Sequence, residues 1–157
     1  MQYLIDAYNM LFLLNEGNDH IEQRRNELIN DFSNTLSDLR IRASLIFDSG
    51  TTHQGDFPHS YKHRGVEIIF SPHGMCADRY IVELAEQIKN TKGATLVSND
   101  RTLCQSCKYH GLNIMSCEAF LDLIEKKQQK QQQHTKENHR DPAYEDYLLK
   151  QFEKDLD

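Results

Sequence analysis

The sequence predicts an α/β domain with a sheet of about five mostly parallel strands flanked by helices, and a C-terminal extension that is helical or disordered. In residues 1–125, short apolar segments alternate with segments of helical periodicity, the pattern of repeated βαβ units. From residue 126 the composition changes to a run rich in Gln, Lys and His. We therefore expect one domain over residues 1–125 and a charged extension with a short amphipathic helix over residues 126–157.

Each predicted element follows from its local pattern. Asp19 with Glu22 resembles a capping box at the start of the first long helix, and Ser116 is placed to cap the last one. The polar segment 49–65 is predicted to be a long loop. The predicted strands cover residues 3–6, 43–48, 66–70, 94–98 and 112–115. The predicted helices cover residues 19–39, 77–90, 101–110 and 116–124.

The C-terminal extension is less regular than the domain. Residues 126–140 carry a formal charge of +4 and are expected to form an exposed helix or a linker. Tyr144, Leu148 and Phe152 follow at intervals of four, which predicts a short amphipathic helix. Such a helix is marginal alone, so it is expected to pack on the domain or on a partner.

Composition excludes several classes of protein. With 157 residues the chain suits one domain, and residues 1–125 have 11 basic and 17 acidic side chains. This acidic balance argues against holding nucleic acid by bulk charge and is compatible with acids that bind a metal. The apolar N-terminus is interrupted by Asp6 and Asn9, so neither a signal peptide nor a membrane span is expected. Four cysteines do not suggest a disulfide scaffold, and a cytoplasmic, reduced protein is expected.

Four acids are expected at the same edge of the predicted sheet. Asp6, Asp48 and Asp100 stand at or just past the carboxyl ends of predicted strands, and Asp78 stands at the start of a helix. In open α/β sheets that edge is where ligands bind. Clustered carboxylates repel one another and raise their pKa values unless a cation neutralises them, and oxygen ligands suit Mg²⁺ or Mn²⁺. A site of this kind serves phosphodiester hydrolysis.

Each acid alone has a simpler interpretation. An acid after a strand often caps the following helix, and Asp78 is most open to this view because acids are favoured in a first helical turn. Asn9, in the first turn after Asp6, has the alternative role of closing a turn. The occurrence of four acids at one predicted edge favours a functional site.

The four acidic positions lie in motifs that resemble those of the NYN domains, which belong to the PIN-like ribonucleases, and the YacP-like branch is the most similar. The motifs are residues 6–9 (Asp-Ala-Tyr-Asn), 46–48 (Ile-Phe-Asp), 77–81 (Ala-Asp-Arg-Tyr-Ile) and 97–100 (Val-Ser-Asn-Asp). The resemblance covers about residues 1–125. It implies a Mg²⁺- or Mn²⁺-dependent endoribonuclease with a flavodoxin-like order of parallel strands.

The resemblance also implies roles for individual residues. These are Asp6, Asp78 and Asp100 as metal-binding catalytic acids, Asp48 and Asn9 as assisting catalytic residues, and Ser98 as a residue that orients one of them. Some family members carry a second acid directly after the Asp78 position, where this chain has Arg79. This difference removes one ligand and puts a second metal in doubt.

Four basic residues are candidate RNA contacts. Lys62 and Arg64 follow Tyr61 in the predicted long loop, and an aromatic side chain among cations suits phosphate neutralisation and base stacking. Arg79 and Arg101 adjoin acidic positions and would face a phosphate bound there. Each of the four has the alternative role of a solvated surface cation.

The expected function is cleavage of RNA phosphodiester bonds, with single-stranded mRNA as the expected substrate and no preference for DNA or contact with a membrane. Whether the ribosome or another large partner presents the RNA stays open. The principal alternative is an RNA- or ribosome-binding adaptor with the same fold and little catalysis, which Arg79 and the acidic domain favour. A toxin-type nuclease is a variant of the first hypothesis.

Two further alternatives are less favoured. A phospho-acceptor domain with Asp48 as the acceptor needs paired acids after the first strand and a Lys after the fifth, and this chain has neither. A zinc site at Cys104 and Cys107 would need more ligands at suitable spacing, and two cysteines on one face of a helix are commonly core residues.

Overall fold

The central strand of the sheet forms from the apolar segment at the N-terminus. β1 (Gln2–Asp6) buries Leu4 and Ile5, which project to opposite faces and are 3% and 0% exposed. A strand covered by helices on both faces has such a continuous apolar sequence instead of an alternating one.

The computed structural model describes residues 1–14, 20–49, 59–139 and 150, with the backbone alone for residues 136–139.

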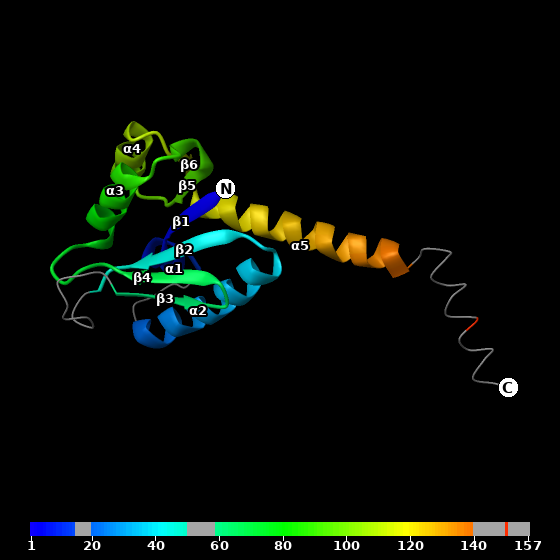
Figure 1. Ribbon diagram of the computed structural model, residues 1–157. Helices are drawn as coiled ribbons and strands as arrows, with labels where there is room; N and C mark the ends of the chain where they lie inside the picture. Colours follow the sequence, from blue (N-terminus) through cyan, green and yellow to red (C-terminus); the bar gives the residue numbers. More distant parts are fainter. Residues whose placement is uncertain (15–19, 50–58, 140–149, 151–157) are drawn as a thin grey trace. The chain divides into compact units, whose positions relative to one another are not determined.

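Six strands and five α-helices are present in these described ranges (Figure 1). The other strands are β2 (Arg42–Phe47), β3 (His59–His63), β4 (Val66–Phe70), β5 (Ala94–Val97) and β6 (Asn113–Met115). The helices are α1 (Ala7–Leu14), α2 (Ile21–Asp38), α3 (Ala77–Gln87), α4 (Arg101–Tyr109) and α5 (Cys117–His139), and a 3₁₀ turn, η1, covers Thr91–Gly93. The predicted α/β fold with a mostly parallel sheet is confirmed.

The strands run in the order β3-β4-β2-β1-β5-β6, and all neighbours except β3 and β4 are parallel. After β1 the chain adds β2 and β4 on one side, then returns to the other side of β1 for β5 and β6. The flavodoxin-like order that the resemblance implies is therefore wrong, because that order does not place the first strand between the second and the fourth parallel strands. This reversal makes the space between the carboxyl ends of β1 and β5 the switch point of the sheet, where ligands of open α/β folds bind.

β3 corrects the predicted long loop over residues 49–65. It pairs antiparallel with β4, and the two-residue turn of Arg64 and Gly65, with φ of 50° and 83°, joins them as a tight hairpin. The sequence gives little sign of this strand because four of its five side chains are exposed and no apolar alternation marks it. Residues 50–58 of the predicted loop lie outside the described residues.

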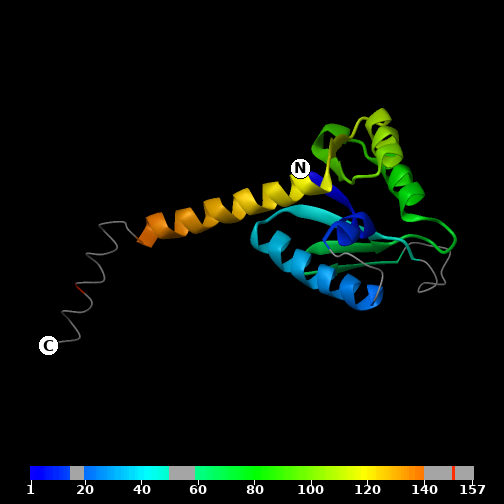
Figure 2. The ribbon, with the colours of Figure 1, turned by 180° about the vertical axis from the view of Figure 1, so that it is seen from behind.

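Helices cover both faces of the sheet (Figures 1 and 2). α3 and α4 pack on the face to which Leu4 and Ile46 project, and form one buried cluster with them. α1 and α2 pack on the opposite face, where Phe47 and Phe70 stack with ring centroids 5.4 Å apart and Arg25 of α2 lies over Phe70. Because both faces are covered, the rim of the sheet is left for polar chemistry.

The helix ends agree only in part with the predictions. Ser116 Oγ accepts a hydrogen bond from Ala119 N at 3.1 Å, which confirms the predicted cap of α5. α5 does not end at residue 124 as predicted but continues to His139, so the polar run is helical to that point. At α2 the N-cap is His20, whose side chain makes no capping bond, while Asp19 of the predicted capping box lies outside the described residues. The predicted helix with Tyr144, Leu148 and Phe152 also lies outside them.

The chain divides into two units, Met1–Leu121 and Asp122–Asp157. The predicted division into residues 1–125 and 126–157 stays a prediction. Of the helices in the described ranges, none combines the length and the apolar character needed to cross a membrane.

Candidate metal and nuclease site

Four carboxylates gather at the carboxyl edge of the parallel strands. Asp6 ends β1, Asp48 follows β2, and Asp100 follows β5 as the N-cap of α4. Asp78 lies in the first turn of α3, which begins after the turn that leaves β4. Asp6 is 6% exposed, whereas Asp78 is exposed. The fold thus brings together the four acids that the sequence predicted at one edge.

Ser98 connects two of these acids. Its Oγ donates a hydrogen bond to Asp6 Oδ2 at 3.0 Å and accepts one from the backbone N–H of Asp100 at 3.0 Å. Asp100 Oδ1 in turn accepts the N–H of Leu103 at 3.1 Å and so caps α4. Asp100 is therefore a helix cap through one of its oxygens, as the simpler interpretation expects. It also belongs to the acidic cluster.

Asn9 acts through a neighbouring turn. Its Oδ1 accepts the backbone N–H of Asn99 at 2.7 Å and lies 3.4 Å from the thiol of Cys117, which donates to it. The Asn99 side chain then bridges to α5, accepting Cys117 N at 2.9 Å and donating to Glu118 at 3.0 Å. The backbone N–H of Asn9 also hydrogen-bonds the Asp6 carboxylate. The Asn9 side chain therefore holds the segment that carries Ser98 and Asp100.

The acids alter one another's protonation. Burial, assisted by the negative charges of Asp78 and Asp100, raises the pKa of Asp6 to about 6, although the hydrogen bonds from Ser98 and from the Asn9 backbone oppose this. The pKa of Asp78 is raised as well, and burial is the largest cause. The charge of Asp100, a hydrogen bond with the Asp100 side chain and the charge of Asp48 raise it further, in that order. A hydrogen bond between two carboxyl groups requires a proton on one of them.

The donor set fits a hard divalent cation. Burial and then the charges of neighbouring acids raise the pKa values of Asp6 and Asp78, and a bound cation would offset both effects by neutralising the carboxylates. Carboxylate oxygens are the ligands that Mg²⁺ and Mn²⁺ prefer. Among the described side chains, however, no three His, Cys, Asp or Glu residues already stand in an arrangement that could hold a metal ion. The chemistry of the site fits the metal, and the ligand geometry is not preformed.

A cavity of about 330 Å³ adjoins the acids. Carboxylates line it at Asp6, Asp48 and Asp78, and apolar side chains line it at Tyr8, Phe12 and Ile21, which we call the apolar wall. Cys76 and Ala77 complete its described lining. The apolar wall was not predicted from the sequence, although Tyr8 and Phe12 are four residues apart on a helix that begins next to Asp6.

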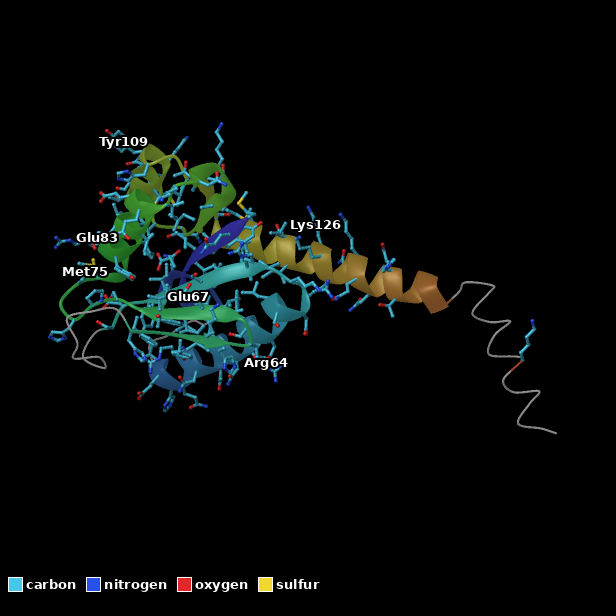
Figure 3. All side chains as sticks on the ribbon, viewed as in Figure 1. Arg64, Glu67, Met75, Glu83, Tyr109 and Lys126 are labelled. Atoms are coloured by element: carbon cyan, nitrogen blue, oxygen red, sulfur yellow. The ribbon has the colours of Figure 1, made fainter. Side chains whose placement is uncertain are left out.

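The predicted RNA contacts do not lie together. Arg79 and Arg101 are exposed in the first turns of α3 and α4, beside Asp78 and Asp100, and Arg79 Nε is 4.0 Å from Glu83. Lys62 and Arg64 lie near the amino end of β4, at the opposite rim of the sheet from the acids. Figure 3 shows Arg64 at that rim and Met75, which precedes α3, at the other. Arg64 there lines a second cavity of about 280 Å³ with Arg40 and Arg42.

Two of the four cysteines are buried core residues, whereas Cys104 is partly buried and Cys76 is exposed. Cys107 and Cys117 are fully buried, and burial raises their thiol pKa values to about 11 and about 12. Zinc is bound by thiolates, so protonated thiols disfavour the zinc alternative.

Comparison with known proteins identifies relatives of the chain. A family model described as the YacP-like NYN domain matches residues 3–157. The chain is similar to two crystal structures of Rae1 (YacP) from Bacillus subtilis. The W164L mutant is 20% identical with a TM-score of 0.67, over 95% of this chain and 90% of that one. The other structure is 23% identical with a TM-score of 0.62, and the match covers 98% of this chain and 93% of that one. No curated protein sequence matches the chain.

Proposed function

Because this chain belongs to the YacP-like NYN domain family, we propose that it is a metal-dependent endoribonuclease that cleaves RNA, with single-stranded mRNA as its expected substrate. The family has a PIN-like RNase fold, NYN-domain RNases act on RNA, and such nucleases typically use divalent metal ions. The observation that carries the proposal is the gathering of Asp6, Asp78 and Asp100 at the switch point of the sheet, where burial and then the negative charges of neighbouring acids raise the pKa values of Asp6 and Asp78. A nuclease of this type needs such a concentration of negative charge.

In the proposed mechanism Asp6, Asp78 and Asp100 hold Mg²⁺ or Mn²⁺, and Asp48 assists them. When bound, such an ion would orient a water molecule and stabilise the charge that develops on the phosphate. Ser98 fixes the Asp6 carboxylate and the backbone of Asp100 relative to each other. In this scheme Asn9 is a positioning residue, since its side chain fixes the adjoining turn.

The test of this proposal uses a circular single-stranded RNA, which has no ends for an exonuclease. We expect the full chain to convert it to linear products in Mn²⁺ or Mg²⁺ and to leave it intact in EDTA. A circular single-stranded DNA of the same sequence tests the expected preference for RNA. Asp6→Asn should lose at least about 100-fold in rate, because it removes one charged ligand beside the phosphate.

A matched control is Asp31→Asn, which changes an exposed acid on α2 outside the cluster. It should cleave like the wild type. Full activity of Asp6→Asn would contradict the assignment of the acids, and cleavage in EDTA would contradict the requirement for a metal.

Two observations favour the adaptor alternative. The described acids do not form a preformed three-ligand group, and Arg79 stands where some relatives have a further acid. An adaptor would bind RNA equally well in EDTA and in Mg²⁺, and Asp6→Asn would bind it as the wild type does. Filter binding under both conditions therefore separates the two functions.

We further propose that the protein acts in the cytoplasm, and that the ribosome or another large partner is a candidate to present its substrate. All four cysteines are free thiols, which suits a reducing compartment. If a partner is required, the circular RNA would be cut only when that partner is added.

A further inference from the structure

We propose that the apolar wall of the acidic cavity, formed by Tyr8, Phe12 and Ile21, is a stacking site for one nucleobase of the RNA, next to the phosphate that is cleaved. This inference rests on the proposed function and adds to it a substrate subsite. The cavity places carboxylates and apolar side chains around one space of about 330 Å³, the lower end of the size range of small-molecule pockets. A nucleotide has the matching two-part chemistry, because its sugar joins a phosphate to a flat aromatic base.

The two aromatic rings of the apolar wall are connected to the buried core through Phe47. Phe47 is fully buried, and Tyr8 meets it edge-on with ring centroids 5.2 Å apart and an interplanar angle of 83°. Phe12 lies one turn after Tyr8 on α1 and stacks with it at 6.2 Å and 26°. Aromatic pairs in these arrangements are mutually stabilising. Tyr8 is therefore fixed by the core, and it supports the ring of Phe12.

The outermost ring is available to a ligand. Phe12 is 49% exposed and Ile21 is 39% exposed, although both are large apolar side chains beside a polar site. A ring that is already held in place loses little conformational freedom when a base stacks on it, which favours binding. Aromatic side chains are the usual surfaces on which the bases of single-stranded nucleic acid stack.

The charges of the cavity favour a base over a second phosphate. Its described lining contains three carboxylates and no Lys or Arg side chain, so an additional anion would be repelled without its own cation. A base is uncharged and stacks without a counter-charge. Because every base has a π-face, the site should bind all four with modest differences.

The direct test is fluorescence of a single-stranded RNA oligonucleotide that contains 2-aminopurine, whose emission is quenched by stacking. It is added in Mg²⁺ to the full chain carrying Asp6→Asn, the variant expected not to cleave. We expect quenching on binding. Adding Phe12→Ala should abolish this quenching and weaken binding about tenfold, which corresponds to about 1.4 kcal/mol. Phe12→Leu, which keeps apolar surface without a ring, should also lose the quenching.

Tyr109→Ala is the matched control, because Tyr109 is 87% exposed at the far end of α4 from Asp100 (Figure 3). It should bind and quench as its parent does. In the cleaving chain, Phe12→Ala should raise KM about tenfold with kcat nearly unchanged, since stacking binds substrate and transition state alike. Because the Phe12 ring is half exposed and makes one stacking contact with Tyr8, Phe12→Ala should lower the thermal midpoint only slightly and remain folded in the assay.

Equal quenching with and without the Phe12 ring, or no quenching by the Asp6→Asn parent, would overturn the stacking site. Equal RNA affinity would do so too, and would leave the apolar wall for a protein partner. The proposed function is tested separately: it would be contradicted if the wild-type chain did not cleave circular RNA in Mn²⁺. That result does not depend on the fluorescence measurement.

Discussion

Ser98 Oγ lies 3.0 Å from Asp6 Oδ2 and donates a hydrogen bond to it, although 92 residues separate the two in the chain. The same hydroxyl oxygen accepts the backbone N–H of Asp100. One buried side chain thus ties the carboxyl end of β1 to the turn after β5, the two sides of the switch point. Together with the hydrogen bond from Asn99 N to Asn9, this hydroxyl fixes the position of Asp100 relative to Asp6.

Ser98→Ala should impair both stability and cleavage. It leaves Asp6 Oδ2 and the Asp100 N–H without their partner, which costs about 1–3 kcal/mol for a buried group. The hydrogen bond from Ser98 lowers the pKa of Asp6, so its loss should raise that pKa further and shift the acid limb of the cleavage profile to higher pH. Urea unfolding and a pH–rate profile measure the two effects.

Ser33→Ala is the matched control for that change. Ser33 is also buried, but its Oγ has no hydrogen-bond partner among the described residues. Removing an unsatisfied buried hydroxyl should leave stability unchanged or raise it. If Ser98→Ala were as harmless as Ser33→Ala, the hydrogen bond to Asp6 would have no importance.

Asp6→Asn should be more stable than the wild type at neutral pH in EDTA. A carboxyl group whose folded pKa is about 6, against an ordinary 3.8, binds its proton more tightly in the folded state. Wild-type stability should therefore fall as pH rises from 3.8 to about 6 and stay lowered above that. The difference between the two pKa values corresponds to at most about 3 kcal/mol.

Asn is uncharged throughout this range, so the unfolding free energies of the two proteins should converge below pH 4 and separate at pH 7.5. Urea unfolding at the two pH values checks this. Equal stability of the wild type and Asp6→Asn at pH 7.5 would mean that burial and the acidic neighbours do not destabilise the charged form of Asp6.

Asn9→Ala should lower stability by about 1–3 kcal/mol, because it leaves the backbone N–H of Asn99 without its acceptor at 2.7 Å. Asn9→Asp keeps an acceptor oxygen and should retain more of this stability. Asn30→Ala, at an exposed position of α2, should change stability by less than about 0.5 kcal/mol. Thermal unfolding compares all three, and equal midpoints for Asn9→Ala and Asn30→Ala would contradict the positioning role.

Lys62→Gln with Arg64→Gln should weaken binding of long RNA and leave cleavage of a short oligonucleotide unchanged. These side chains lie at the rim opposite the acids, so only an RNA long enough to reach both rims would meet them. If each contacts one phosphate, the slope of log affinity against log salt should fall by about 1.4. A titration at several salt concentrations measures it, and an unchanged slope would identify both residues as solvated surface cations.

The sequence predicted the features that depend on local pattern. Apolar runs located five of the six strands. Asp6 and Asp48 were located by the ends of two of these runs, Asp100 by its place just past a third, and Asp78 by the start of a helical pattern. The cap at Ser116 was equally local. These features need no knowledge of which strands are neighbours.

Other features depend on contacts between distant segments. β3 exists because its backbone pairs with β4, and its exposed side chains leave no apolar signature. The role of Asn9 is decided by Asn99, 90 residues later. The apolar wall likewise combines Tyr8 and Phe12 with Ile21 of another helix. Patterns within one segment do not contain this information.

A metal site built from these acids is tested by calorimetric titration of Mn²⁺ into the wild type, Asp78→Asn and Asp31→Asn, with cleavage of a labelled RNA measured in parallel. We predict saturable Mn²⁺ binding and Mn²⁺-dependent cleavage for the wild type and Asp31→Asn, and loss of both for Asp78→Asn. Mn²⁺ binding to Asp78→Asn with wild-type affinity, or no binding to the wild type, would contradict the account and leave the four acids as helix caps.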